Sequence, residues 1–314
     1  MDHGNQRSED LWHTLDQRQT ATVVLETAIF SLVMVLSLFG NLLVSFAVYR
    51  NPRLRGQPSN YYIISLALSD VLQALFTIPL SVGMLATGEW RNGIPACYFM
   101  VISMLSLAST SIFTMTLMAL NRYYKIVKPA KYQNIFTKKF TIVTGALAWI
   151  ASIFYSILTV FAFDFDVSPH PGLAICKIEL RKLYFPILVI VQNTPFFFIM
   201  FCFWKIYKVV KMHNADISWQ NLNAEEVNIS KTFFATVFCF VILWVPANII
   251  LLPSHLTVDG FNFPRIISLI GALLAFTSSC LNPFIYGFMN RAFRIEFKKC
   301  FILRKPQSIG IGSN

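Results

Sequence analysis

Long apolar stretches alternate along the chain with short polar segments that are mostly basic. Seven of the apolar stretches carry few or no charges and hold about 20 or more residues, the length that a helix needs to cross a bilayer core. The alternation therefore predicts seven membrane-spanning helices. The predicted spans are Thr27–Tyr49, Asn60–Leu85, Ile94–Leu120, Phe140–Phe163, Leu183–Trp204, Thr232–Pro253 and Ile266–Met289.

The composition favours the same class of protein. Of the 314 residues, 55% are hydrophobic and only 13% are charged, which is typical of a membrane protein. After the last span, Phe293, Phe297 and Phe301 recur every fourth residue in a basic segment, which predicts a short amphipathic helix at the membrane interface. We expect an all-α membrane protein. Its expected parts are an extracellular tail over residues 1–21, a seven-helix bundle over 22–289, the interfacial helix over 290–303 and a cytoplasmic tail over 304–314.

Lysine and arginine residues predict the orientation. With the N-terminus outside, most of the 26 Lys and Arg residues fall in the cytoplasmic loops and the C-terminal segment, as the positive-inside rule requires. We therefore expect a multi-pass plasma-membrane protein with an extracellular N-terminus. The same asymmetry accounts for the net charge of +11, so no nucleic-acid partner is needed to explain it. Residues 1–20 lack the apolar core of a signal peptide, and no cleaved signal is expected.

The cysteine positions predict one disulfide. In this topology, Cys97 at the outer end of the third span and Cys176 in the second outer loop are the two cysteines that face the oxidising compartment, so we expect a bridge between them. Cys300 follows a basic amphipathic segment and is a candidate for palmitoylation.

A single acid interrupts the second span. Asp70 is the only charge between Gln57 and Thr87, and a carboxylate at mid-bilayer costs several kcal/mol. Such a residue is either part of a functional site or one end of a buried structural hydrogen bond. Asn41 in the first span is its expected partner, because a buried amide also needs hydrogen bonds.

Two charged residues mark the inner ends of the third and sixth spans. Arg122 ends the third span and Glu226 begins the sixth, and a pair between them would hold the inner halves of these helices together. Two simpler interpretations stay open: Arg122 extends its head group to the interface, and Glu226 complements the positive end of its own helix. Pro246 and Pro283 are expected to bend the last two spans.

Together these residues resemble the rhodopsin-like (class A) family of G-protein-coupled receptors, over all seven spans and the last helix. The family's pattern maps onto Asn41, Asp70, Trp149, Pro195, Trp244, Pro246, Asn282, Pro283 and Tyr286, with its disulfide at Cys97 and Cys176. The resemblance implies a receptor whose partners are an extracellular ligand, a heterotrimeric G protein and membrane lipids. It implies activation by an outward movement of the sixth helix.

The resemblance also implies two groups of functional residues. The first is an ion site, which would accept Na⁺ or a proton and consists of Asp70, Ser111, Ser278, Ser279 and Asn282. The second is an activation switch consisting of Asn121, Arg122, Tyr123, Glu226, Trp244, Pro246, Pro283 and Tyr286, connected through Ile112, Pro195 and Phe240.

Within the family, the chain is most similar to the melatonin-receptor-like group. The segments that carry this similarity are Asn121-Arg122-Tyr123, Trp244-x-Pro246-x-Asn248 and Ser279-Cys280-Leu281-Asn282. Two ligand-binding residues of that group differ here, where Val191 replaces a His and Leu180 replaces a Gln, and Pro283 replaces its usual Ala. Three departures concern the wider family: Asn121 replaces an acid, Phe203 a Tyr and Ala130 a bulky apolar residue.

The ligand pocket that the resemblance implies is apolar with two amide side chains. This favours a neutral, mostly apolar small molecule, although the same residues could pack on one another as core. An amine ligand would lack its usual Asp, because that position is Met104, and retinal would lack its Lys, because that position is Phe276. The expected wall consists of Met104, Leu105, Ala108, Leu188, Val191, Gln192, Trp244, Asn248, Ala272 and Phe276.

Other functions are less consistent with the sequence. No catalytic constellation and no His/Cys cluster with metal spacing is present, so we expect neither an enzyme nor a metal site. No cofactor is expected apart from the possible Na⁺. A peptide-binding receptor of the same family stays open, because acids such as Glu89, Asp166 and Glu179 lie in the outer loops. A small transporter or channel would need more buried polar groups along a continuous path than Asp70 supplies.

Overall fold

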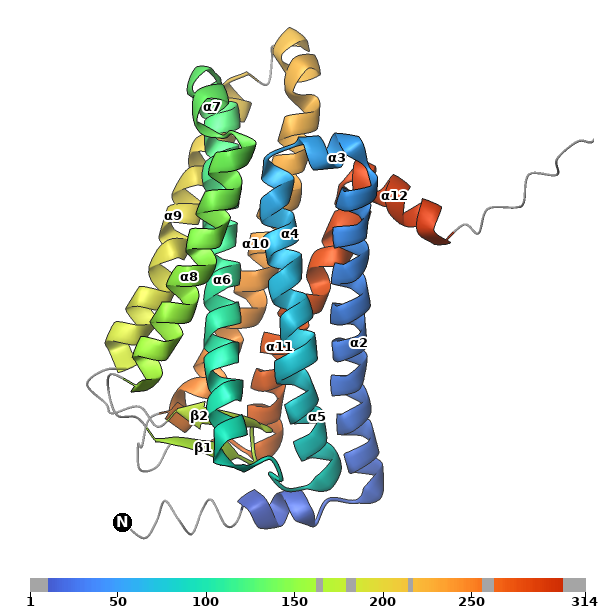
Figure 1. Cartoon of the computed structure of the whole chain (residues 1–314), viewed down its shortest axis with the longest axis vertical. Coiled ribbons are helices and arrows are strands. Elements are labelled where there is room, and N and C mark those ends of the chain that lie inside the picture. The colour runs from blue at the N-terminus through green and yellow to red at the C-terminus, as the bar shows by residue number, and fades with distance from the viewer. Residues whose placement is uncertain (1–10, 162–165, 179–184, 214–216, 256–262, 302–314) are drawn as a thin grey trace, which may run out of the picture.

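The computed structural model describes residues 11–161, 166–178, 185–213, 217–255 and 263–301. Its long helices run side by side in one bundle (Figure 1). They are α2 (Thr20–Arg50), α4 (Ser59–Leu72) continued by the π-helical turn η1 (Gln73–Thr77) and α5 (Ile78–Thr87), α6 (Gly93–Val127), α8 (Lys138–Phe161), α9 (Phe185–Met212), α10 (Ile217–His255) and α11 (Arg265–Met289). These helices occupy the positions of the seven predicted spans.

Short elements lie at both ends of the bundle. One end, called here the C-terminal end, carries α3 (Pro52–Gly56), α7 (Pro129–Ile135) and α12 (Arg291–Phe301), and α12 lies crosswise to the bundle (Figure 1). The other end, the N-terminal end, carries an antiparallel hairpin of β1 (Val167–His170) and β2 (Ile175–Ile178).

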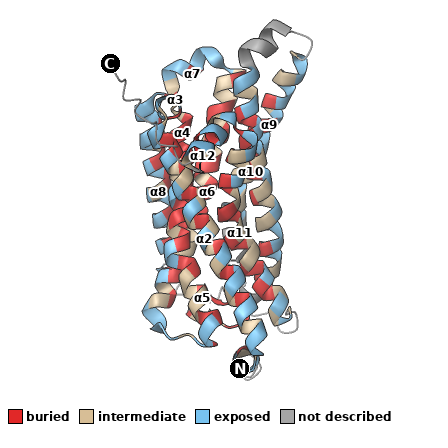
Figure 2. Ribbon diagram, turned by 90° about the vertical axis from the view of Figure 1, so that its right-hand side faces the viewer, coloured by how far each residue is buried: buried red, intermediate tan, exposed pale blue. Residues whose placement is uncertain are grey.

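Helix length and hydropathy support the membrane assignment. Within the described residues, six helices are long and apolar enough to cross a bilayer, namely those at Thr20–Arg50, Ser59–Thr87, Gly93–Val127, Lys138–Phe161, Ala224–Leu251 and Arg265–Met289. The fifth predicted span corresponds to α9, which has 28 residues. It is not among these six helices, and the side chains of its first residues lie outside the described part. Exposed residues lie along the outside of the bundle (Figure 2). They include large apolar side chains such as Phe197 and Phe288, which lipid would cover.

Two boundaries differ from the sequence-based expectation. The sixth helix begins at Ile217, whereas the sequence predicted that Glu226 begins the sixth span, so the segment before Glu226 is helical from Ile217 onward. Hydropathy locates only the part of a helix inside the bilayer, and a polar helix can continue beyond it. The first helix begins at Thr20 and buries Glu26, which the predicted span excluded because Glu26 is charged.

The interior consists of two apolar clusters separated by polar residues. One cluster fills the N-terminal end and includes Phe30, Met100 and Phe276. The other fills the C-terminal end and includes Ile112, Phe233 and Tyr286. Many of the buried residues between them along α2, α4, η1, α6 and α11 are polar, and we call the following nine the polar layer: Ser37, Asn41, Ser69, Asp70, Gln73, Ser111, Ser278, Ser279 and Asn282.

Glycine allows two close helix contacts next to these clusters. A Cβ at Gly40 of α2 would lie 2.8 Å from Cγ of Pro283, and a Cβ at Gly271 of α11 would lie 2.7 Å from Cγ2 of Ile250. Both distances are too short for carbon atoms that are not bonded. Small residues at such positions let membrane helices approach each other closely, and here they bring α11 against both α2 and α10.

Candidate receptor core: the polar layer, the switch residues and the disulfide

Asp70 lies at the centre of the polar layer. Its side chain is 2% exposed, and Asn282 of α11 donates from Nδ2 to its Oδ2 at 2.8 Å. The sequence therefore identified the two residues that face each other between α4 and α11. Because a buried carboxylate needs partners, this contact is a condition for the second and seventh spans to pack together.

Asn41 does not bond to the Asp70 side chain, so that expectation is wrong. Its Nδ2 donates to the backbone oxygens of Ser37 and Ser279, both at 2.9 Å. The amide thus joins α2 to α11, and Asp70 takes part only through its backbone oxygen, which accepts from Ser37 Oγ at 3.3 Å.

The other predicted ion-site residues bond to different partners. Ser279 Oγ donates to Gln73 Oε1 at 2.8 Å, Ser111 Oγ lies 3.0 Å from Ser69 Oγ, and Ser278 Oγ accepts from Trp244. The sequence analysis missed Gln73. A signal for it was present, because a residue three positions after Asp70 lies on the same face of a helix.

Gln73 also begins the π-helical turn η1. Pro79 follows this turn and has no N–H to donate to a carbonyl four residues earlier. The wide turn places the polar face of the second span against α11, and π-helical turns recur at functional sites.

Arg122 pairs with Glu226 at the C-terminal end. Nη1 of Arg122 lies 2.7 Å from Oε2 of Glu226, and the side chains are 2% and 27% exposed. Lys125 Nζ lies 3.6 Å from the other carboxylate oxygen, and the Arg122 guanidinium lies 5.2 Å from the ring centre of Phe233. The pair joins α6 to α10.

The position of Glu226 excludes one of the simpler interpretations. Glu226 lies nine residues after Ile217, the first residue of α10, and the effect of a helix dipole falls off within the first turn. Helix-dipole stabilisation therefore does not explain Glu226. Arg122 is buried against Phe233 and does not extend to the interface, so the second simpler interpretation is also wrong.

Asn121 has a different partner from its neighbour Arg122. It is fully buried, and its Nδ2 donates to the Tyr132 hydroxyl of α7 at 3.5 Å. Tyr123 is only half-buried. Asn121 thus orients the second inner loop and supplies no charge to Arg122.

Aromatic rings connect the polar layer with the middle of α10. Trp244 Nε1 donates to Ser278 Oγ at 3.0 Å, and the Trp244 ring stacks on Phe240 with ring centres 5.2 Å apart. The ring centre of Phe240 lies 5.9 Å from that of Phe196, the residue after Pro195. Phe240 and Ile112 both belong to the apolar cluster of the C-terminal end. Tyr286 continues this cluster to Phe293 of α12.

The predicted pocket residues divide into two sets. Ala108, Ala272 and Phe276 are buried, and Gln192 Oε1 accepts from Ser109 at 3.2 Å. Met104, Leu105 and Trp244 are partly buried. Val191 and Asn248 are exposed, so they contribute no buried wall, and the side chain of Leu188 lies outside the described residues, as does Leu180.

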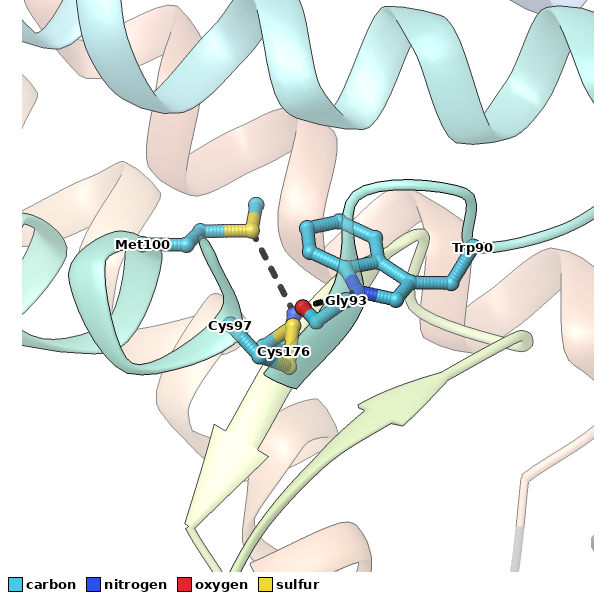
Figure 3. Close-up of a disulfide and its surroundings, with 5 residues drawn as sticks. All are labelled: Trp90, Gly93, Cys97, Met100 and Cys176. Carbon is cyan, nitrogen blue, oxygen red and sulfur yellow. Dashed lines mark hydrogen bonds between the residues drawn. A yellow bond between two sulfur atoms is a disulfide. The ribbon is translucent and has the colours of Figure 1, made fainter. Parts of the chain in front are cut away.

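The predicted disulfide is confirmed. Cys97 and Cys176 are bonded with their Cα atoms 5.4 Å apart, which ties β2 to the start of α6 (Figure 3). The backbone N–H of Cys176 donates to Met100 Sδ at 3.4 Å, and Trp90 Nε1 donates to the Gly93 oxygen beside it. The bridge holds the hairpin over the N-terminal end of the bundle.

Comparison with known families decides the identity of this fold. The family of seven-transmembrane receptors of the rhodopsin type matches residues 40–286, which include all of the polar layer except Ser37 and the whole Arg122–Glu226 pair. The chain belongs to the rhodopsin family of G-protein-coupled receptors. This family consists of receptors, which agrees at the family level with the sequence-based exclusion of an enzyme.

The relatives of the receptor include the predicted group. The chain is 28% identical to the mouse (Mus musculus) melatonin receptor type 1A over 276 residues, covering 86% of this chain and 78% of the relative. It is 27% identical to the octopamine receptor beta-2R of Chilo suppressalis, covering 87% and 78%, and 26% identical to the human histamine H2 receptor, covering 91% and 81%. Squid rhodopsin shares the fold, with a TM-score of 0.80 at 20% identity over 93% of this chain and 88% of that chain.

A cleft of about 990 Å³ opens at the C-terminal end of the receptor. Its lining combines α3, the last turns of α9, the first described side chains of α10 and the start of α12, and it includes the cations Arg53, Lys231 and Arg291. The cleft is a recess of mixed character beside the inner end of α10, in which three cations and one acid, Glu225, lie among apolar side chains.

Proposed function

We propose that this receptor binds an extracellular, neutral and mostly apolar small molecule at its N-terminal end and activates a heterotrimeric G protein at its C-terminal end. The excess of Lys and Arg at the C-terminal end supports a cytoplasmic position for that end. The disulfide supports an extracellular position for the opposite end, because disulfides persist in oxidising compartments.

The Arg122–Glu226 pair is the observation that carries the proposal. It joins α6 to α10 at the end where a G protein would dock, with one partner almost fully buried. A pair in such a site is stronger than a surface pair and has two discrete states, formed and broken. Breaking it frees the inner end of α10 to move outward.

The aromatic contacts of α10 supply a route from the pocket to that pair. Trp244 contacts Phe240 on one side and Ser278 of α11 on the other, and Pro246 follows Trp244 by two residues. A ligand that changes the position of Trp244 would act at the bend of the helix. The inner half of α10 would then swing away and enlarge the cleft for a G-protein helix.

Residue identities in the pocket narrow the ligand class. The octopamine and histamine relatives are named for amines, whereas this chain has Met104 at the position where amine receptors keep an Asp, and a buried amine needs a counter-charge. The melatonin relatives are named for a neutral molecule. We do not propose melatonin itself, because Val191 and Leu180 replace two residues of that group.

The residue types of the polar layer suit a small cation. Asp70 supplies carboxylate oxygens, and Ser111 and Ser279 supply hydroxyl oxygens, which hard cations prefer. Asn282 donates from Nδ2 to Asp70 and would have to turn its amide oxygen toward the cation. We propose that Na⁺ or a proton at this site favours the inactive state, since a buried carboxylate is costly without a cation or donors.

A reporter experiment tests the proposed function. Cells that express the receptor with a promiscuous G protein are screened with neutral small molecules, and active compounds are retested on Arg122→Ala at matched surface expression. We expect compounds that signal through the parent receptor and lose their signal in the variant. Signalling that persists in Arg122→Ala, or hits that are all cationic amines or peptides, would contradict the proposal.

A further inference from the structure

A buried ion cluster lies at the N-terminal end of the receptor. Glu26 of α2 is 6% exposed, and two guanidinium groups converge on it. Arg265 of α11 donates through Nη1 and Nη2 at 2.7 and 2.6 Å, and Arg18 donates through Nη1 at 2.5 Å. The side chains of Arg18 and Arg265 are 5% and 10% exposed. We call these three residues the ion cluster.

Arg18 connects the ion cluster to the segment before the first span. Its Nε donates to the Leu15 oxygen at 2.7 Å, and its Nη2 donates to the Leu85 oxygen near the end of α5 at 2.5 Å. Arg18 thus joins the N-terminal segment directly to the first and second spans, and Glu26 extends the connection to Arg265 of the seventh span. Ion pairs of this geometry are strong because each guanidinium fork has several fixed donors.

Residues 11–18 fold against the N-terminal end of the bundle, and we call this segment the lid. Leu15 is 1% exposed and belongs to the apolar cluster of the N-terminal end, and Trp12 packs against the same cluster. The segment runs beneath the bundle near the β1–β2 hairpin, at the bottom of Figure 1, and Leu11 faces Gly172 between the two strands. An extracellular tail would not bury a leucine unless it had a defined docking position.

The lid and the hairpin cover the region of the predicted ligand pocket. Leu173, Ala174 and Ile175 of the hairpin are 0–1% exposed inside the same cluster as Leu15. Phe30, one helical turn below Glu26, contacts the pocket residue Phe276 edge to face at 6.0 Å. A molecule that approaches the pocket between α2 and the hairpin would therefore have to displace the lid.

We propose that residues 11–18 form a lid over the ligand pocket, that the ion cluster holds this lid closed, and that the cluster selects against cationic molecules. This inference rests on the proposed function, which places the pocket at this end. Within the described residues, Glu26 is the acid that pairs with both arginines, so the cluster carries a net charge of +1. A buried positive charge repels cations at close range, because little water screens it.

Cysteine accessibility tests the lid without a ligand or a G protein. Met104→Cys is introduced into the full-length receptor, which is purified into nanodiscs, and the labelling rate is measured with neutral, cationic and anionic methanethiosulfonates. The receptor without Met104→Cys gives the background from native cysteines. The assay does not depend on signalling. A result that contradicts the lid can therefore be distinguished from a result that contradicts the proposed function.

The variants separate the ion cluster from general surface charge. Arg18→Gln should raise the neutral labelling rate about tenfold, which corresponds to ~1.4 kcal/mol of lid opening. Arg91→Ala is the control, since it removes an exposed ion pair with Glu89 at the same end, and it should leave the rate unchanged. Leu15→Ala removes the apolar contact of the lid without touching the cluster and should also speed labelling.

Charge selectivity gives an independent readout. The measured quantity is the ratio of the cationic to the anionic labelling rate, divided by the same ratio for a free thiol in solution. We expect this value to be below one for the parent receptor and closer to one for Arg18→Gln. Glu26→Gln should lower it further below one. Labelling at the parental rate in both Arg18→Gln and Leu15→Ala would overturn the lid, and a charge preference equal to that of the free thiol would overturn the selectivity.

Discussion

Removing the Glu226 carboxylate should raise ligand-independent signalling. In Glu226→Ala, Arg122 loses its 2.7 Å partner, and nothing else ties the inner ends of α6 and α10 by charge within the described residues. Asn121 cannot take over, because it is an amide that bonds to Tyr132. Under the proposed function, the resting state therefore depends on the single carboxylate of Glu226, which also pairs with Lys125.

The size of the effect follows from the burial of the two partners. A half-desolvated pair contributes ~1–3 kcal/mol, and the 27% exposure of Glu226 and the sharing with Lys125 place this pair near the middle of that range. A loss of ~2 kcal/mol shifts a two-state equilibrium about 30-fold, so a receptor that is ~1% active without ligand would become roughly a quarter active.

The assay measures basal G-protein activation at matched surface expression. Glu89→Ala is the control, since it removes an acid from an exposed ion pair at the opposite end. Asn121→Asp supplies the reverse change: a second carboxylate beside Arg122 should lower basal signalling. If Glu226→Ala lowers expression without raising basal activity, while Asn121→Asp has no effect, the ion pair does not restrain the resting state.

Three further predictions concern the polar layer, the disulfide and the helix contacts. Agonist affinity should fall as sodium rises, and Asp70→Asn should abolish this dependence; a sodium-independent parent receptor would exclude the sodium site. Cys97→Ser or Cys176→Ser should reduce surface expression several-fold, measured by antibody labelling of intact cells, and normal expression of both would mean that the bridge is dispensable. Gly40→Val should destabilise the detergent-solubilised receptor by ~1–3 kcal/mol in thermal unfolding because its side chain would collide with Pro283, whereas Gly83→Val, where a Cβ meets nothing within 4 Å, should not.

The sequence was sufficient where a residue had few possible partners. Cys97 and Cys176 were the two cysteines on the oxidising side, and the structure joins them. The pair of Arg122 and Glu226 depended on more than position. Both residues lie at the inner boundary of apolar helices, but two simpler interpretations stayed open, and the resemblance to the rhodopsin-like family supplied the pairing that the structure contains.

The sequence was insufficient where many equivalent partners compete. Hydroxyls and amides in the polar layer can each bond to several neighbours, and the sequence does not indicate that Ser279 bonds to Gln73 or that Asn41 bonds to the Ser279 backbone oxygen. The ion cluster was missed for another reason. Glu26 was taken as the polar boundary of the first span, whereas Arg18 and Arg265, 8 and 239 residues away, bury it.

The position of the polar layer explains how one helix can move without unfolding the receptor. A close-packed apolar cluster resists sliding because every displacement opens voids, whereas hydroxyls and amides can exchange one hydrogen bond for another. In α10, Phe240 belongs to the C-terminal cluster and Leu251 to the N-terminal cluster, and Pro246 lies between them. The turn η1 begins at Gln73 of the polar layer, and Pro283 follows Asn282 of the same layer. These irregular positions therefore adjoin the layer whose contacts are easiest to rearrange, and under the proposed function the Arg122–Glu226 pair would resist that rearrangement from the C-terminal end.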